Sequence, residues 1–212
     1  MISATATPHR QAVPAISARE DGDAVRSALY GLISHLFFAP PSTALLQQIA
    51  GSREVIAGLD GLADAWHALV DAAQQADPET LRGEFDPLFV SAGRPPVLLY
   101  ASSYMQGQRK GHLLAELRDD LIQLGYRRSD DASEYEDHVS ALCDVMRGLI
   151  VDEDGPDASF AAQQKFFRCY LSPWYAALCT ALEGAEQTRF YRDVSRFVAA
   201  FFTNESGYFE LA

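Results

Sequence analysis

The sequence predicts an all-α fold, built as a single-domain bundle of roughly ten helices. Past about residue 22, apolar residues recur at intervals of three and four through most of the 212-residue chain, and this spacing places them on one face of a helix. Prolines, glycines and capping residues divide the chain into lengths typical of single helices. Strand signals are absent, because no sustained period of two occurs and no Asn-Gly or Asp-Gly turn joins alternating hydrophobic runs.

The start of the chain differs from the rest. We expect residues 1–22 to be a disordered tail and residues 23–212 to form the helical domain. Met1–Arg19 contains scattered Ala, Ser, Thr and Pro, with neither the basic start nor the apolar centre of a secretion signal. No stretch of the chain approaches the ~18 apolar residues that span a bilayer. The sequence therefore predicts a cytoplasmic protein without stable membrane insertion.

The helices of the first half are delimited by prolines and capping residues. A Pro40-Pro41 pair stops the first helix. Asp77 is the expected N-cap of a later helix, with Pro78 at its first position, and Pro87 interrupts the segment that follows. The helices expected here are Asp23–Phe38, Ser42–Ala50, Leu62–Ala76 and a short one after Asp77.

The second half begins with an irregular stretch, residues 91–111, which is rich in Gly and Pro. A loop of this length in a compact domain is typically functional or mobile. Beyond it, Ser133 and Glu136 have the spacing of a capping box, so the clearest helix is expected to open at Glu134. The helices expected here are His112–Leu124, Glu134–Ile150, Ser159–Leu171, Pro173–Leu182 and Glu186–Thr203.

The charge of the chain narrows its possible partners, and its cysteine content indicates its redox compartment. The formal net charge is −12, which argues against nucleic acid, because Lys and Arg supply most of the affinity for phosphates. It favours a basic partner, although acidity also simply keeps a protein soluble. The three cysteines form no Cys-x-x-Cys pair, and their odd number excludes a full disulfide framework. A reducing compartment fits this pattern.

Signatures of catalysis are missing from the sequence. It contains no phosphate-binding Gly-rich loop, no Gly-x-Ser-x-Gly and no His-Glu-x-x-His, so we expect neither catalytic residues nor a bound cofactor. The alternative hypothesis is a helical metal-dependent enzyme that uses the acidic clusters at Asp119-Asp120 and Asp130–Asp137. On a helix, Glu134 and His138 would share a face as two metal ligands. A solvated acidic face, together with an acidic helix N-terminus stabilised by the helix dipole, explains these residues more simply.

Three ordered segments resemble the TorD/DmsD family of redox-enzyme maturation chaperones, which are related to NarJ. Segment 84–89 (Glu-Phe-Asp-Pro-Leu-Phe) is similar to an aromatic-x-x-Leu-Phe motif, and a Pro-containing loop follows it. Segment 134–138 (Glu-Tyr-Glu-Asp-His) resembles a Glu-x-Asp-His motif. Segment 164–174 resembles a phenylalanine-rich helix followed by a Leu-x-Pro-Trp turn. Here Tyr170 stands where many relatives have His.

The resemblance implies a non-catalytic cytoplasmic chaperone. Such proteins bind the twin-arginine signal peptide of a molybdopterin oxidoreductase and assist cofactor insertion and assembly before export. The partner would be the leader, the body of the catalytic subunit, or both, and the chaperone itself a monomer or homodimer. Carried over by position, the peptide-binding residues are Phe85, Leu88, Phe89, Pro96, Tyr104, Glu136, Asp137 and His138.

The chemistry of such a leader agrees with these residue types. Two guanidinium groups followed by an apolar stretch call for carboxylates beside an apolar groove. Glu136 and Asp137 would supply the acid, and Leu88, Phe89 and the loop 96–104 the groove. The residues alone leave alternatives open. Glu136 could serve as a helix cap and nothing more, and Leu88 and Phe89 could belong to the core. His138 could cap the helix, pair with an acid or contact the peptide.

Overall fold

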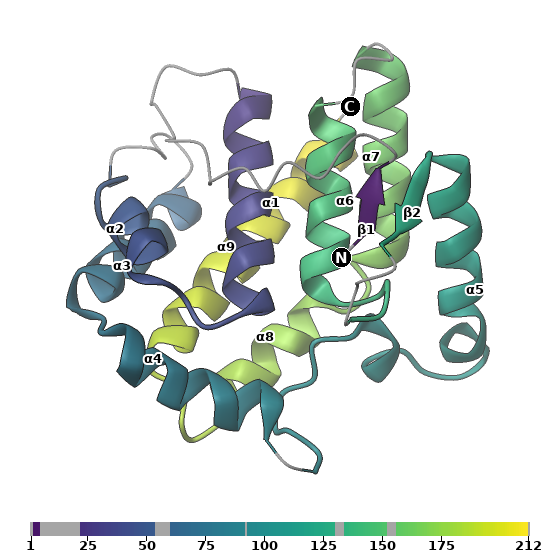
Figure 1. Cartoon of the computed structure of the whole chain (residues 1–212). Helices are drawn as coiled ribbons and strands as arrows, with labels where there is room; N and C mark the ends of the chain where they lie inside the picture. The colour runs from purple at the N-terminus through teal and green to yellow at the C-terminus, as the bar shows by residue number, and fades with distance from the viewer. Residues whose placement is uncertain are drawn as a thin grey trace. The chain divides into compact units, whose positions relative to one another are not determined.

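The computed structural model describes residues 2–4, 22–53, 60–91, 93–129, 134–151 and 156–211. Within them the structure is predominantly helical (Figure 1), and the predicted all-α class is confirmed. The chain forms two compact units. Unit 1 takes its described residues from 1–14, 21–38 and 99–174, and unit 2 from 39–98 and 175–212. The expectation of one domain over 23–212 stays a prediction.

Unit 1 is built around two long helices, α1 (Gly22–Phe38) and α6 (Val139–Val151), which pack along each other (Figure 1). Both present nearly continuous buried faces, so their contact forms the centre of this unit's core. Inside it, the hydroxyls of Ser34 and Ser140 lie 2.9 Å apart and satisfy each other. Helix α7 (Pro156–Tyr170) packs on α6.

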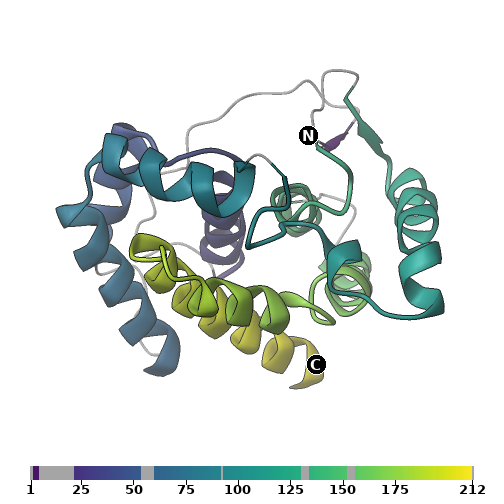
Figure 2. The same ribbon diagram turned by 90° about the horizontal axis from the view of Figure 1, so that it is seen from below.

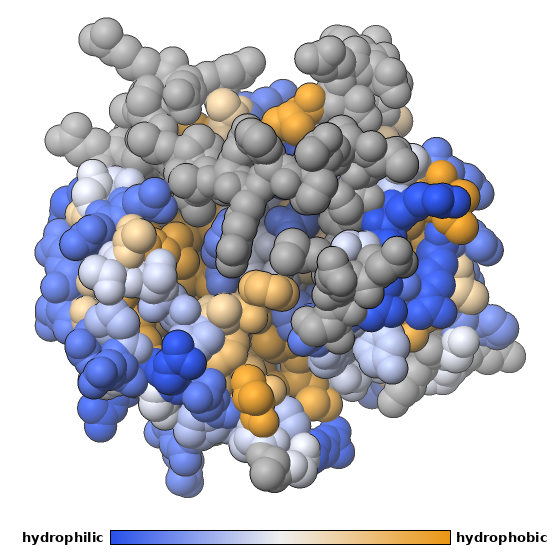
Figure 3. All heavy atoms as spheres, viewed as in Figure 1, coloured by the Kyte–Doolittle hydropathy of each residue, from blue (hydrophilic) through white to orange (hydrophobic). Residues whose placement is uncertain are grey.

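A small sheet and helix α5 (Gln108–Gln123) complete unit 1. Strands β1 (Ile2–Ala4) and β2 (Tyr126–Arg128) pair antiparallel, and β1 also contacts α6. Gly125 joins α5 to β2 with φ of 77°, a backbone conformation that glycine adopts without strain. In Figure 3, the side where α5 lies is mostly hydrophilic, with a few hydrophobic residues near the C-terminal end of the helix.

Unit 2 is organised around α9 (Phe190–Leu211). Helices α8 (Tyr175–Gly184) and α9 run side by side (Figure 2), and α3 (Asp60–Gln75) packs on α9. The rings of Trp66 and Phe197 meet there with centroids 5.4 Å apart. The shorter elements of this unit are α2 (Thr43–Ala50), α4 (Pro78–Phe85) and a π-helical turn, η1 (Asp86–Val90).

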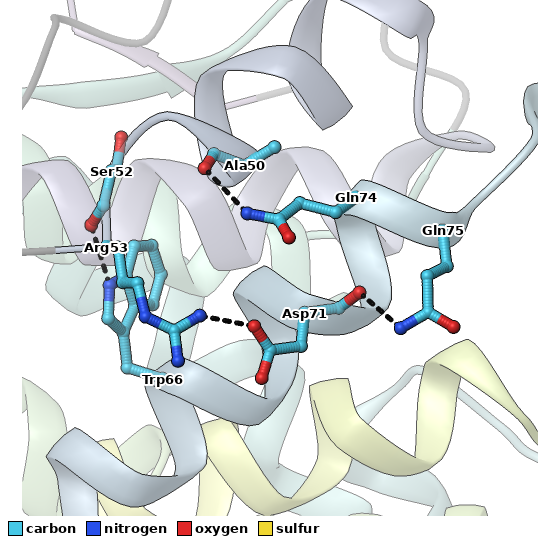
Figure 4. A network of polar contacts seen from close by, with 7 residues as sticks. All are labelled: Ala50, Ser52, Arg53, Trp66, Asp71, Gln74 and Gln75. Atoms are coloured by element: carbon cyan, nitrogen blue, oxygen red, sulfur yellow. Dashed lines mark hydrogen bonds and ion pairs between the residues drawn. The ribbon is translucent and has the colours of Figure 1, made fainter.

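A polar network fixes the segment after α2 onto α3 (Figure 4). The indole nitrogen of Trp66 donates to the carbonyl of Ser52 at 2.9 Å, and Arg53 forms an ion pair with Asp71. Gln74 donates to the carbonyl of Ala50 at 3.4 Å. The bonds from Trp66 and Gln74 satisfy carbonyls at and just beyond the C-terminus of α2, which have no partners inside that helix.

Two predicted helix starts are confirmed, and a side chain caps the helix at each. Ser42 caps α2, where its hydroxyl accepts the amide of Leu45 at 3.2 Å. Asp77 caps α4 with Pro78 at the first position, and its carboxylate accepts the amide of Thr80 at 2.9 Å. These signals are local, since the capping side chain and the amide it binds lie within three residues.

Other expectations are wrong. Helix α5 begins at Gln108 instead of His112, and α9 continues to Leu211 instead of ending at Thr203. The expected absence of strands fails for β1 and β2, which are too short to show a period of two. Strand β1 lies within the predicted tail, whose residues 5–21 fall outside the described residues.

The largest error concerns the start of α6. The helix begins at Val139 and not at Glu134, and its proposed capping residue Ser133 falls outside the described residues. Residues 136 and 137 form a turn, and His138 forms an isolated antiparallel bridge with Tyr100. The backbone here bonds to a distant segment, so it is not available for a helical ladder.

Candidate functional site

The eight predicted binding residues fall into two groups, each within one unit. Unit 2 contains Phe85, Leu88, Phe89 and Pro96, and unit 1 contains Tyr104, Glu136, Asp137 and His138. Each group has its own geometry.

In unit 2, the predicted aromatic motif builds part of the core. Phe85 and Leu88 are buried, and Phe89 is partly exposed. The rings of Phe85 and Phe89 meet edge to face at 4.9 Å, and both contact the ring of Tyr191, at 5.9 and 5.0 Å. The motif therefore attaches the end of α4 to the start of α9.

Pro87 shapes the backbone between these side chains. It lacks an amide hydrogen, and the chain around it forms the π-helical turn η1. The carbonyl of Leu88 instead accepts the amide of Val97 at 3.3 Å, which folds the following loop back onto η1. Pro96, the neighbour of Val97, is exposed and accessible to a partner.

Glu84, which precedes this motif, has a structural role that sequence reasoning missed. Its buried carboxylate accepts the amides of Arg189, Phe190 and Tyr191 at 2.8, 3.2 and 2.9 Å. These amides belong to the residue before α9 and to its first two residues, which have no partner inside the helix and carry the positive end of its dipole. An acid beside an apolar motif was the available signal, but the sequence does not show which helix it caps.

In unit 1, Asp137 joins the start of α6 to the loop after residue 98. Its carbonyl accepts the amide of Ala101 at 3.0 Å, and its carboxylate accepts the amide of Ser102 at 2.9 Å. The amide of Val139 donates to the carbonyl of Leu99 at 2.9 Å. We call this set of bonds between residues 99–102 and 137–139 the 100–138 bridge.

Glu136 pairs with a guanidinium of this same chain. Arg118 on α5 donates from Nε to Oε1 and from a terminal nitrogen to Oε2, both at 3.0 Å. Burial raises the pKa of Glu136, but the hydrogen bonds and charge of Arg118 outweigh it, so the pKa lies below its ordinary value. The carboxylate therefore remains ionised and already has the planar, bidentate partner that arginine provides.

His138 is buried in this bridge as a neutral ring. Its Nδ1 accepts the amide of Ser140 at 3.2 Å, which places the proton on Nε2. Burial lowers the pKa of His138 to about 4, against the opposing charges of Glu134 and Asp137. The ring of Tyr100 meets it edge to face at 5.1 Å. The hydroxyl of Tyr100 donates to Glu134, and burial, followed by this bond, raises the pKa of the tyrosine.

Tyr104 lies at the end of the same loop. Its ring stacks on that of Trp174 with centroids 5.5 Å apart, and the indole nitrogen of Trp174 donates to the carbonyl of Tyr170 at 2.6 Å. The side chains of Ser102, Ser103 and Tyr104 are all partly exposed. Among the four predicted residues of unit 1, Tyr104 is therefore the one that solvent reaches, since the other three are buried.

Several acidic residues of the metal hypothesis bond to groups of this chain. Asp120 accepts the hydroxyl of Tyr170 and the ammonium of Lys165, both at 2.7 Å. Glu134 and His138 precede α6 and do not share a helix face, so that expectation is wrong. Among the described residues no group of three or more His, Cys, Asp or Glu is placed to hold a metal ion. Asp130 and Asp131 lie outside that part of the chain.

The chain is similar to proteins of known family. A family model described as nitrate reductase delta subunit matches residues 58–180, which include all eight predicted residues. Chaperone protein TorD of Vibrio parahaemolyticus is 23% identical over 201 residues, covering 86% of this chain and 94% of that protein. A crystal structure of a candidate redox enzyme maturation protein from Archaeoglobus fulgidus is 22% identical, with a TM-score of 0.52, and the match covers 85% of this chain and 93% of that one.

The family match covers more than half of the chain, and the resemblance stated from the sequence is confirmed. This chain belongs to the nitrate reductase delta subunit family, together with the TorD-related chaperones of redox-enzyme maturation.

Proposed function

We propose that this protein is a cytoplasmic chaperone that binds the twin-arginine signal peptide of a molybdopterin oxidoreductase and assists cofactor insertion and assembly before export. The family match over residues 58–180 carries this proposal. On this view the protein acts by binding and not by catalysis, and holds no cofactor of its own. Among the described residues, no helix is both long and apolar enough to cross a membrane.

Charge supports the choice of partner. The chain has a net charge of −12, and a twin-arginine leader adds two guanidinium groups to an apolar stretch. Opposite charge speeds encounter and favours basic over acidic peptides. The exposed Pro96 in unit 2 and the partly exposed Tyr104 in unit 1 are the surfaces proposed to contact the leader.

Calorimetry with synthetic leader peptides tests the proposal. Leaders of molybdoenzymes encoded near this gene should bind. Replacing both arginines of such a leader by alanine should weaken binding at least tenfold, or about 1.4 kcal/mol, because the peptide loses the positive charges that the acidic chain attracts. A scrambled peptide of equal charge controls for non-specific attraction. Failure to bind any such leader would sink the proposal.

A second arm separates leader binding from binding of the mature enzyme body. Pull-down of the client catalytic subunit with and without its leader should show stronger capture of the full-length form. Equal capture of both forms would instead place the main contact on the body. Size-exclusion chromatography with light scattering decides between the two proposed states, a monomer and a homodimer.

A further inference from the structure

The two acids predicted to receive leader arginines have different neighbours from those expected. Glu136 is already held by both donors of Arg118. Asp137 is 1% exposed, and its carboxylate bonds to a backbone amide of the loop that contains Ser102. A guanidinium arriving from solvent pairs best with an accessible carboxylate, because removing both charges from water carries a large desolvation cost.

The bonds of Asp137 point instead to a role in shaping the loop. Asp137 holds two consecutive amides, Ala101 through its carbonyl and Ser102 through its carboxylate. These amides open the 3-10 turn η2 (Ala101–Ser103), whose first amides have no partner inside the turn. The turn ends at Tyr104, which stacks on Trp174. One buried residue thus holds the start of this partly exposed turn, and its carboxylate supplies the bond to Ser102.

We propose that Asp137 is a positioning residue for peptide binding: it fixes residues 101–104 in the conformation that contacts the leader, and its charge does not pair with the leader's arginines. This inference rests on the proposed function, and it assigns the contact in unit 1 to Ser102, Ser103 and Tyr104. Glu136 and His138 support the same arrangement from either side, through Arg118 and Ser140.

Two substitutions at one position separate charge from hydrogen bonding. Asp137→Asn removes the charge but keeps a side-chain oxygen that accepts the amide of Ser102. Asp137→Ala removes both. If Asp137 is a positioning residue, the Asp137→Asn variant should bind the leader peptide within about threefold of wild type, with the same salt dependence. The Asp137→Ala variant should bind at least tenfold more weakly than wild type. Direct pairing predicts that Asn is as weak as Ala and that its affinity depends less on salt.

Glu183→Gln is the matched control for the loss of one negative charge. Glu183 is exposed on α8, so this variant measures the effect of net charge alone. Calorimetry should be run well below the melting temperature of each variant, with circular dichroism showing equal helicity. If Asp137→Ala binds weakly, Asp137→Asn binds normally and both have the helicity of wild type, a general loss of fold is excluded as the cause of the weaker binding.

Hydrogen exchange tests the mechanism without peptide. In Asp137→Ala the amide of Ser102, which loses its carboxylate acceptor, should exchange at least tenfold faster than in wild type, while Asp137→Asn leaves it protected. The amide of Ala101 bonds to the backbone carbonyl of residue 137, which both variants keep. In wild type, added leader should further protect residues 101–105. Unchanged exchange in Ala, or equal binding by all three proteins, would overturn the inference. If wild type binds no leader, the proposed function fails, and the exchange result still decides whether Asp137 shapes the loop.

Discussion

At the scale of single residues, burial decides what each polar group of the motif can do. Glu136, Asp137 and His138 are charged or titratable types that the sequence places side by side, yet all three are buried and each bonds within the chain. His138 has a partner inside the chain, because its ring accepts the amide of Ser140. Whether any of these side chains also touches a peptide stays a prediction.

His138 should make stability depend on pH. Its pKa is about 4 in the folded protein and about 6.5 unfolded, so between these values the unfolded state binds the extra proton. Stability therefore falls as pH drops from 6.5 toward 4, by about 2 kcal/mol at pH 5 relative to pH 7. Urea unfolding at both pH values should show this drop reduced by that amount in His138→Gln. An equal drop in both proteins would contradict the burial argument.

Gly148 lies where helix α6 packs closely against Tyr126. A Cβ at this position of α6 would lie 2.0 Å from the hydroxyl and 2.9 Å from the ring carbon of Tyr126. Gly148→Ala should therefore lower the free energy of unfolding by about 1–3 kcal/mol, although alanine is the better helix former. Gly111 on α5 has nothing within 4 Å of a built Cβ, so Gly111→Ala should leave stability unchanged or raise it.

The cause of that loss can be isolated by a second substitution. In a Tyr126→Leu background the clash with the phenol is removed, so Gly148→Ala should cost less than it does in wild type. An undiminished cost, measured by chemical unfolding, would show that some other contact disfavours alanine there.

At the scale of elements, long-range contacts set where helices begin. Local caps at Ser42 and Asp77 were predictable because the capping side chain and its amide lie three residues apart. The start of α6 was not, because residues 137–139 bond to residues 99–102, about 36 positions away. Helix α9 shows the complementary case, since its cap comes from Glu84 in a different helix.

The cap from Glu84 should matter for the folding of unit 2. Glu84→Ala leaves the first amides of α9 in a buried site without an acceptor, which should cost about 3 kcal/mol of unfolding free energy. Glu84→Gln keeps an acceptor but loses the charge that favours the helix N-terminus, so its cost should be smaller. Exposed Glu183→Ala is the control. A Glu84→Ala variant as stable as this control, measured by thermal unfolding, would contradict the capping role.

At the scale of the whole molecule, the acidic charge fits either a chaperone for a basic peptide or a metal-dependent enzyme. Added magnesium distinguishes these two explanations. If the acidic residues are occupied as the structure describes, with Asp120 bound to Lys165 and Tyr170, millimolar Mg²⁺ should not raise the melting temperature. A metal-dependent enzyme would be stabilised by its ion through binding linkage. A clear upward shift, abolished by EDTA, would revive the enzyme hypothesis.

The sequence by itself determined the all-α class, most helices and the family, because apolar spacing, local caps and short motifs are properties of neighbouring residues. The tertiary structure alone decided which contacts the motif residues make within the chain. Phe85 and Leu88 are buried in the core, and Glu136 forms an ion pair with Arg118. The carboxylate of Asp137 accepts an amide of the loop 101–104. Burial and hydrogen-bond partners depend on which distant segments meet, and no local pattern specifies that.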